Sequence, residues 1–150
     1  MIDLIIDMCI LLSGSGKGDP LYEIDCRKLM KEFLKKSELF LALDEKGKIK
    51  YQYDKNLKPG TYGEFWLKQM ASQDKIRHIP WQRFAKGTKT ALQEAHFDTE
   101  DYKYVETAAF TECKTISTHD SDYSARIRKI LKKIKIKVKF PDECIEAFCE

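Results

Sequence analysis

Residues 2–7 of the chain are Ile2-Asp3-Leu4-Ile5-Ile6-Asp7, an apolar, largely β-branched run that ends in a carboxylate. Runs of this kind are typical of a strand buried in the middle of a sheet. We predict that the apolar segment 1–12 forms such a strand. Burying a carboxylate at the end of a strand costs free energy unless the carboxylate has a partner or a function. Asp7 is therefore a candidate functional residue. The alternative is that Asp7 only begins a turn.

Segments typical of strands and of helices alternate along the rest of the chain. Apolar spacing predicts helices at residues 22–36, 64–72, 101–110, 124–133 and 142–148. Strands are expected at 40–44, 114–118 and 134–140, whereas 49–53 fits either a strand or the start of a helix. This alternation predicts an α/β fold with a mostly parallel central sheet.

Two segments lack such periodicity. Residues 13–20 are a loop by composition, and they do not match a phosphate-binding P-loop, because Leu11 and Gly18 stand where Gly and Ser or Thr are needed. We expect Lys17 to touch a substrate backbone instead. The region around 58–90, especially 74–89, is predicted to be an insertion or a long functional loop.

Length and composition indicate one globular domain over residues 1–150. The hydrophobic content is 43%, the charged content is 34% and the net charge is +3, which is too small to prove a nucleic-acid partner. The five cysteines form no C-x-x-C pair, which favours a reducing cytosol over a disulfide framework. No apolar run reaches the roughly 18 residues of a membrane span. We therefore predict a cytoplasmic protein without a membrane partner.

Carboxylates recur where predicted strands end and a helix begins. Asp120 and Asp122 follow the strand at 114–118, and Asp101 opens the helix at 101–110. The carboxyl ends of parallel strands share one edge of the sheet, where ligands bind. Carboxylates are hard oxygen ligands for Mg²⁺ or Mn²⁺, which lower the pKa of a bound water and stabilise a leaving oxygen. We predict that Asp7, Asp101 and Asp120 bind a metal ion, with Asp122 in support.

Helix capping is the alternative role for these acids. Asp98 precedes Asp101 by three residues, a pattern close to a capping box, and both roles can hold with Asp98 as the cap. The segment Asp120-Ser121-Asp122 has the composition of an N-cap for the helix at 124–133.

Basic residues suggest where a substrate binds. Arg77 and Arg83 lie in a stretch that also holds Trp81 and Phe84, whose rings either stack on unpaired bases or anchor the loop. His119 is a candidate phosphate contact, although an isolated histidine near a turn is more often a capping or surface residue. From 126 to 139 there are eight basic residues and no acid. The lysines of the expected strand at 134–140 either protect an edge strand from aggregation or bind a nucleic-acid backbone.

Four segments, taken in order, resemble a PIN-domain nuclease: residues 5–7, 97–108, 116–123 and 136–141. The most specific is Thr118-His119-Asp120-Ser121-Asp122-Tyr123, a T-x-D-x-D-[YF] element after a strand. The resemblance implies a three-layer α/β/α sandwich and metal-dependent hydrolysis of RNA, often single-stranded. It also implies that Asp7, Asp101 and Asp120 are the metal-binding acids, with Asp122 supporting them.

The chain departs from the family pattern at two positions. The family has D-x-N at its first acid, where this chain has Asp7-Met8-Cys9. The family also has a glutamate before a tyrosine, where this chain has Gln52, which keeps the shape and a carbonyl ligand but loses the charge. Three explanations stay open: a weak or lost activity, an engineered inactive variant, or a different glutamate, with Glu32 and Glu38 as candidates.

The leading hypothesis is an endoribonuclease that uses Mg²⁺ or Mn²⁺ and cleaves RNA, or else DNA. The resemblance implies a prokaryotic toxin or an antiviral defence effector, with a regulatory partner such as an antitoxin or a defence-complex subunit. One alternative is a catalytically weakened PIN-like module that binds nucleic acid or protein. Another is a phosphatase-like enzyme with Asp7 as nucleophile, against which the missing D-x-D-x-T motif counts. Self-association into a homo-oligomer is left open.

Overall fold

A computed structural model describes residues 1–82 and 84–150. Five strands form one sheet in the order β3-β2-β1-β4-β5, and each neighbouring pair is parallel. The strands are β1 (Ile2–Ile6), β2 (Leu39–Asp44), β3 (Ile76–Ile79), β4 (Thr115–Ser117) and β5 (Lys137–Lys139). The predicted α/β fold with a parallel sheet is confirmed.

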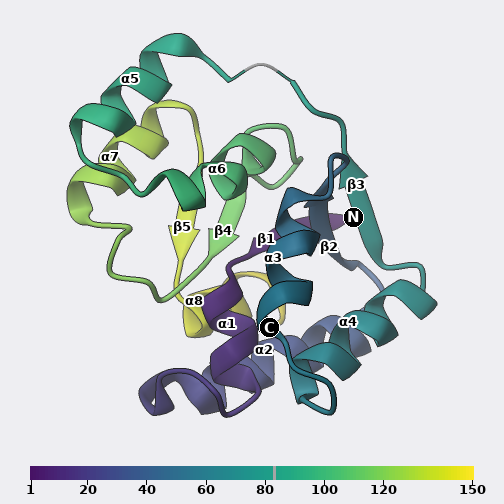
Figure 1. Ribbon diagram of the computed structural model, residues 1–150. Coiled ribbons are helices and arrows are strands. Elements are labelled where there is room, and N and C mark those ends of the chain that lie inside the picture. The colour runs from purple at the N-terminus through teal and green to yellow at the C-terminus, as the bar shows by residue number, and fades with distance from the viewer. Residues whose placement is uncertain (83) are drawn as a thin grey trace.

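Helices cover both faces of the sheet, as the two groups in Figure 1 show. One group is α1 (Met8–Gly14), α2 (Glu23–Lys35), α4 (Tyr62–Ser72) and α8 (Pro141–Phe148). The other is α3 (Lys48–Asn56), α5 (Lys86–Glu94), α6 (Tyr102–Ala108) and α7 (Ala125–Lys133). Short 3-10 turns, η1 (Pro20–Tyr22) and η2 (Thr99–Asp101), precede α2 and α6. The molecule is therefore the three-layer α/β/α sandwich that the resemblance implies.

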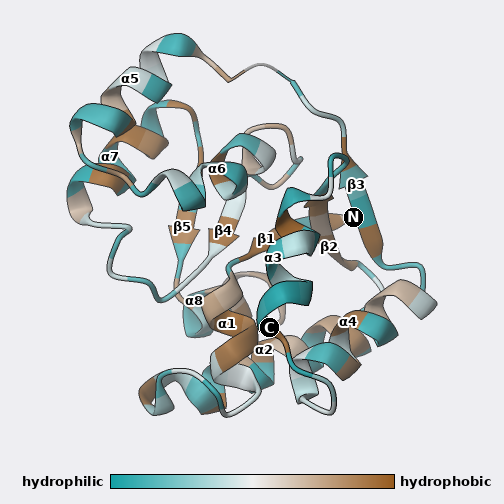
Figure 2. Ribbon diagram, in the orientation of Figure 1, coloured by the Kyte–Doolittle hydropathy of each residue, from teal (hydrophilic) through white to brown (hydrophobic). Residues whose placement is uncertain are grey.

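The core lies along the central strands and the inner faces of the helices. Leu4, Ile5 and Ile6 of β1 are buried, and Figure 2 shows hydrophobic residues on β1, β4 and α1. Between α2 and α4, Trp66 is fully buried and its indole N–H donates a 2.7 Å hydrogen bond to the Met30 carbonyl. None of the described helices has both the length and the apolar character that a bilayer crossing requires.

The strand order reverses at β1. After β1 the chain adds β2 and then β3 on one side, and it later returns to place β4 on the other side of β1. In open parallel sheets ligands bind beyond the carboxyl ends of the strands at such a switch point. Here those ends are the ends of β1 and β4, which are followed by Asp7 and Asp120.

The prediction that segment 1–12 is one strand is wrong beyond Ile6. Asp7 is the N-cap of α1, because its carboxylate accepts a hydrogen bond from the Cys9 amide. The apolar residues that follow pack as a helix against α2. A fully apolar strand and a fully buried helix have the same composition, so the run alone did not reveal the break.

The stretch at 74–89 is not an unstructured insertion in its described part. It contains β3, which pairs with β2 through Ala42 and Arg77, and it leads into α5. The strand has only four residues and lies at the edge of the sheet, where most of its side chains are partly exposed. Its sequence therefore shows no alternation of apolar and polar residues that would have predicted a strand. The segment 49–53, open between strand and helix, belongs to α3.

Candidate metal centre

Asp7 follows the end of β1 and is 4% exposed. Its Oδ1 accepts a 3.3 Å hydrogen bond from the Cys9 amide, and its Oδ2 accepts a 2.7 Å hydrogen bond from the Thr118 hydroxyl. Burial raises the pKa of Asp7 against the effect of these two donors, and the charge of Asp120 raises it further. The acid at the strand end is therefore held in place beside a second carboxylate.

The loop after β4 brings two more acids to the same edge. The Thr118 hydroxyl also accepts a 3.0 Å hydrogen bond from the Asp120 amide, which ties this loop to the end of β1. Asp120 in turn accepts a 2.9 Å hydrogen bond from the Asp122 amide through Oδ1. The N-cap of α7 is Ser124, so the interpretation of residues 120–122 as that cap is wrong.

The turn η2 supplies acids from the other side. Asp98 caps η2 by accepting a 3.0 Å hydrogen bond from the Glu100 amide, as predicted. Asp101 is 7% exposed at the start of α6. Burial, followed by the charges of Asp7, Asp120 and Asp98, raises the pKa of Asp101 to about 7. A proton on this carboxyl is therefore exchanged near neutral pH when no cation is bound.

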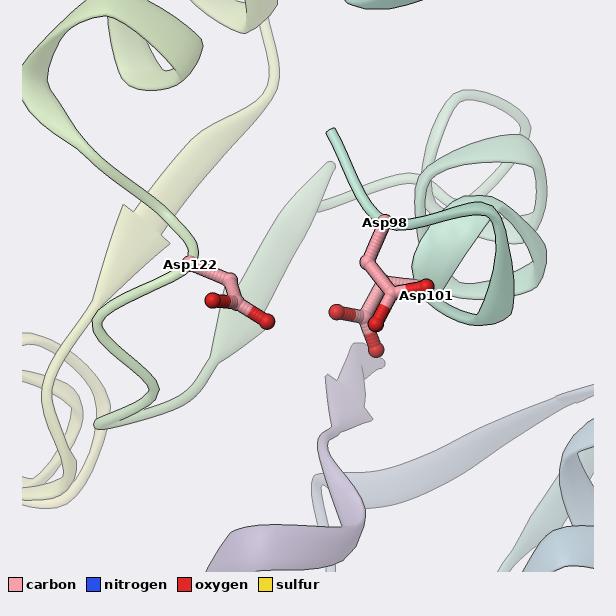
Figure 3. Close-up of side chains that lie close together, drawn as sticks. All are labelled: Asp98, Asp101 and Asp122. Atoms are coloured by element: carbon pink, nitrogen blue, oxygen red, sulfur yellow. The ribbon is translucent and has the colours of Figure 1, made fainter. Parts of the chain in front are cut away.

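Three carboxylates converge above the end of β1. One oxygen each of Asp98, Asp101 and Asp122 lies within 4.8 Å of the others, and Figure 3 shows Asp122 opposite the other two. The pKa of Asp122 is raised by the charge of Asp120, by burial and by the charge of Asp98. Like charges gathered so closely repel one another, and a cation offsets that repulsion. These three acids can hold a metal ion.

The structure places the predicted acids in and beside this triad. Asp101 and Asp122 belong to it, while Asp7 and Asp120 border it, since both raise the pKa of Asp101. Asp98 is the member that sequence reasoning treated only as a cap. The available signal was the spacing of Asp98 and Asp101, because two acids three residues apart lie on one side of a helical turn.

A buried hydroxyl near the triad has no hydrogen-bond partner among the described residues. Tyr123 is 3% exposed, and its phenolic oxygen is unsatisfied. Burial raises the pKa of Tyr123 well above its ordinary value, and Asp7 and Asp101 are the next causes. Buried polar groups normally find a partner, so this orphaned hydroxyl is consistent with a site that receives a polar ligand or water.

Gln52 lies outside the triad and is linked by hydrogen bonds to the backbone beside Asp7. Its Oε1 accepts a 2.5 Å hydrogen bond from the Tyr104 hydroxyl, which itself accepts a 3.1 Å hydrogen bond from the Met8 amide next to Asp7. Gln52 also lines a cleft of about 750 Å³. The charged residues that line it are four lysines and two glutamates, so its lining has a net positive charge: Lys46, Lys48, Lys55, Lys103, Glu100 and Glu106. Thr99 also lines it and belongs to η2, so this basic cleft adjoins the turn that carries Asp98 and Asp101.

The two alternative glutamates lie away from the triad. The Glu38 carbonyl accepts a 2.7 Å hydrogen bond from the Ile2 amide at the amino end of β1, opposite to Asp7. Glu32, on α2, and Glu38 both raise the pKa of Cys149 near the end of the chain, after burial as the main cause. Neither is placed to supply the missing second acid.

Two predicted substrate-binding residues have internal partners. Arg77 forms a 2.5 Å ion pair with the fully buried Asp3. The Nε2 atom of His119 lies 2.9 Å from the Ser13 hydroxyl and 3.2 Å from the Cys9 carbonyl, and its ring stacks on Tyr22 with 4.3 Å between centroids. Arg77 therefore connects β3 to β1, and His119 connects the loop after β4 to α1.

The other two predicted substrate contacts differ in position. Lys17 is exposed after α1 and lines a separate cleft of about 640 Å³ with Ser15, Lys58 and Tyr62. Arg83 lies outside the described residues. None of the predicted substrate-binding residues that the structure describes belongs to the acid triad.

No protein-family model matches this chain, and no curated protein matches it. The interpretation of the site therefore depends on the residues described above.

Proposed function

We propose that this protein is a metal-dependent endonuclease that hydrolyses phosphodiester bonds, with RNA as its substrate and Mg²⁺ or Mn²⁺ as its metal. The observation that supports it most is the convergence of Asp98, Asp101 and Asp122 at the switch point of the sheet. Asp7 and Asp120 add two further carboxylates around them. The bordering basic cleft offers charge complementary to a phosphate backbone.

The donor set fits a hard divalent cation. All three groups are carboxylates, and oxygen donors of this kind suit Mg²⁺ and Mn²⁺ rather than soft metals. Asp98, Asp101 and Asp122 would hold the ion, with Asp7 and Asp120 close by. The unsatisfied Tyr123 hydroxyl provides a further polar group near the site. When bound, the cation supplies Lewis-acid stabilisation of phosphate charge and a more acidic water.

The residues of the chain then contribute positioning and charge neutralisation. Thr118 holds the Asp7 carboxylate and the Asp120 backbone in a fixed relation. Without a cation the pKa of Asp101 is raised to about 7, chiefly by burial, and a bound cation would favour the ionised carboxylate that holds it. Lys46 and Lys48 on the wall of the cleft can neutralise the phosphates of a bound strand. An assignment to a toxin–antitoxin or defence system, in the cytoplasm and under a protein partner, depends on the sequence resemblance alone.

A catalytically weakened binding module is the second candidate. The observation that favours it is Gln52, a neutral side chain hydrogen-bonded to Tyr104 where the resemblance implies an acid. Such a module would bind nucleic acid without a divalent cation and would not cleave it.

The test is cleavage of labelled single-stranded RNA and DNA with Mn²⁺ by the wild type and by Asp101→Asn. The matched control is Asp74→Asn, an exposed acid with φ of 56°, a conformation that asparagine tolerates. We expect Asp101→Asn to lose at least about tenfold in rate and Asp74→Asn to keep the wild-type rate. RNA binding without cleavage by the wild type would favour the binding module. Absence of both Mn²⁺ binding and cleavage would refute the proposal.

A further inference from the structure

A second basic surface lies along the edge strand β5, away from the acid triad. It is a groove of about 770 Å³, which we call the β5 groove. Its basic lining residues are Lys114, Arg128, Lys132, Lys135, Lys137 and Lys139. Lys114 and Lys135 precede β4 and β5, so they lie at the amino ends of these strands, whereas the acids Asp120 and Asp122 follow the carboxyl end of β4.

The positive charge of the β5 groove is not compensated within the described chain. Glu112 is the single acid among its described lining residues, and it lies 3.6 Å from Arg77 in an ion pair. In the part of the chain that the structure describes, no carboxylate forms an ion pair with the six basic residues. Like charges lining one groove raise the local potential and attract a polyanion.

Two of these lysines have a left-handed backbone, which determines how their charge can be removed without disturbing the fold. Lys114 has φ of 48° and Lys135 has φ of 64°, which is the left-handed region. Among the described residues other than glycine only Asp74 and His96 share it. A left-handed residue with a side chain costs roughly 1–2 kcal/mol, and glycine or asparagine fits such positions better. At Lys135 the left-handed backbone ends α7, because the Lys135 and Ile136 amides donate to the Lys132 and Leu131 carbonyls. Asparagine at these two positions therefore removes the charge while keeping the backbone.

Arg128 determines how the β5 groove can be used. Its Nε donates to the Tyr123 carbonyl at 3.0 Å and its Nη1 donates to the Val138 carbonyl at 3.3 Å. The backbone of Lys137 and Lys139 already bonds to the β4 side of the sheet, so Val138 carries the outward-facing carbonyl of this edge. Because Arg128 occupies that carbonyl, an added peptide strand would lack an acceptor. Recognition through side-chain charges is favoured over strand addition.

We propose that the β5 groove binds the phosphodiester backbone of a nucleic acid and holds it without cleaving it. The choice of nucleic acid among polyanions rests on the proposed function. Lys139 is in register with Ser117, the last residue of β4, so the groove leads toward the loop that carries Asp120. A strand held there is bound by contacts that need no metal, on a surface that runs from the amino ends of β4 and β5 to the loop leading to Asp120.

The test is fluorescence anisotropy with a labelled single-stranded RNA 12-mer in EDTA, which prevents metal-dependent cleavage. We compare the wild type with Lys114→Asn/Lys135→Asn. The matched control is Lys28→Gln/Lys31→Gln, which removes two exposed lysines from α2. We expect the groove variant to bind the RNA at least about fivefold more weakly. The slope of log binding constant against log salt concentration should become shallower by about 0.7 for each phosphate contact that is lost. Its melting temperature should be unchanged or higher, since asparagine accepts the left-handed backbone.

A second variant, Lys132→Gln/Lys137→Gln, removes two exposed charges without altering a left-handed position and should weaken binding in the same way. Equal affinities for the groove variants and the α2 control would overturn the proposal. Competition by poly-glutamate as strong as that by unlabelled RNA would also overturn it, in favour of an acidic protein segment. Failure of the acid site would abolish Mn²⁺-dependent cleavage but leave this EDTA-based binding intact, so the two failures are distinguishable.

Discussion

The Thr118 hydroxyl donates a 2.7 Å hydrogen bond to the Asp7 carboxylate and so connects the loop after β4 to the end of β1. The same oxygen accepts from the Asp120 amide at 3.0 Å. One side chain therefore sets the relative positions of two carboxylates that are far apart in the sequence. The geometry of the acid site depends on this connection as well as on the acids themselves.

Thr118→Val should destabilise the protein, because it removes a donor from a carboxylate that is 4% exposed. We expect the free energy of unfolding to fall by about 1–3 kcal/mol, measured by urea denaturation. Thr118→Ser keeps the hydroxyl and is the control. An unchanged urea midpoint for the valine variant would show that Asp7 does not depend on this bond.

Asp101 should make the metal-free protein less stable as the pH rises. Its pKa is raised, chiefly by burial, from an ordinary 3.8 to about 7 in the folded state, so between these values the folded chain binds a proton that the unfolded chain has lost. Folding stability contributed by this group is therefore lost as the pH rises from about 4 to 7. We expect the melting temperature of the wild type minus that of Asp101→Asn, measured in EDTA, to decrease across this window. A melting-temperature difference that does not change with pH would contradict the raised pKa of Asp101.

A divalent cation should reverse this destabilisation. Mn²⁺ at about 100 times its dissociation constant stabilises a folded protein by about 2.7 kcal/mol, so we expect a rise of several degrees in melting temperature at pH 7. The variant Asp98→Asn/Asp122→Asn should lose the rise, because it removes two of the three converging carboxylates. Asp74→Asn should keep it. A rise retained by the double variant would place the bound ion elsewhere.

Gln52→Glu should strengthen cation binding. The new carboxylate would accept the Tyr104 hydrogen bond and add negative charge beside the cleft that adjoins η2. We expect Mn²⁺ affinity to rise about threefold to tenfold, measured by calorimetry, with faster RNA cleavage. Gln73→Glu adds the same charge at an exposed position after α4 and should change neither quantity. If both variants behave alike, Gln52 does not occupy the second-acid position.

Arg77→Met should affect folding rather than RNA binding. Asp3 is fully buried and is paired with Arg77, and it also accepts hydrogen bonds from the Glu112 and Cys113 amides. Loss of the arginine leaves a buried charge uncompensated, for which we expect about 3 kcal/mol of destabilisation. Asp3→Asn/Arg77→Met should recover part of it, because the charge is removed as well. A large loss of RNA affinity with unchanged stability would restore the predicted substrate role of Arg77.

The α/β class and most of the regular elements were predictable from apolar spacing. Local periodicity of apolar residues predicted the helices α2, α4 and α7 and the strands β2 and β4. This periodicity arises because one face of each element packs against the core. The boundary between β1 and α1 and the existence of β3 were missed. In both cases the deciding interactions are tertiary: helix packing against α2, and pairing of a short edge segment with β2.

The candidate site shows the same division. Asp7, Asp101, Asp120 and Asp122 were recognisable as acids at the ends of strands or the start of a helix, and the structure brings them to one edge of the sheet. The participation of Asp98 was not recognisable, because a capping role already accounted for it. The contacts of Arg77 with Asp3 and of His119 with Ser13 could not be predicted either, because the partners are distant in the sequence.

The sequence by itself determined that this chain alternates strands and helices and carries acids at the strand ends, because periodicity and residue type are local properties. Only the tertiary structure decided the strand order, the switch point between β1 and β4 and the convergence of Asp98, Asp101 and Asp122. It also decided which lysines line the β5 groove. Each of these depends on contacts between segments far apart in the chain, whose pairing is selected by the packing of the whole core.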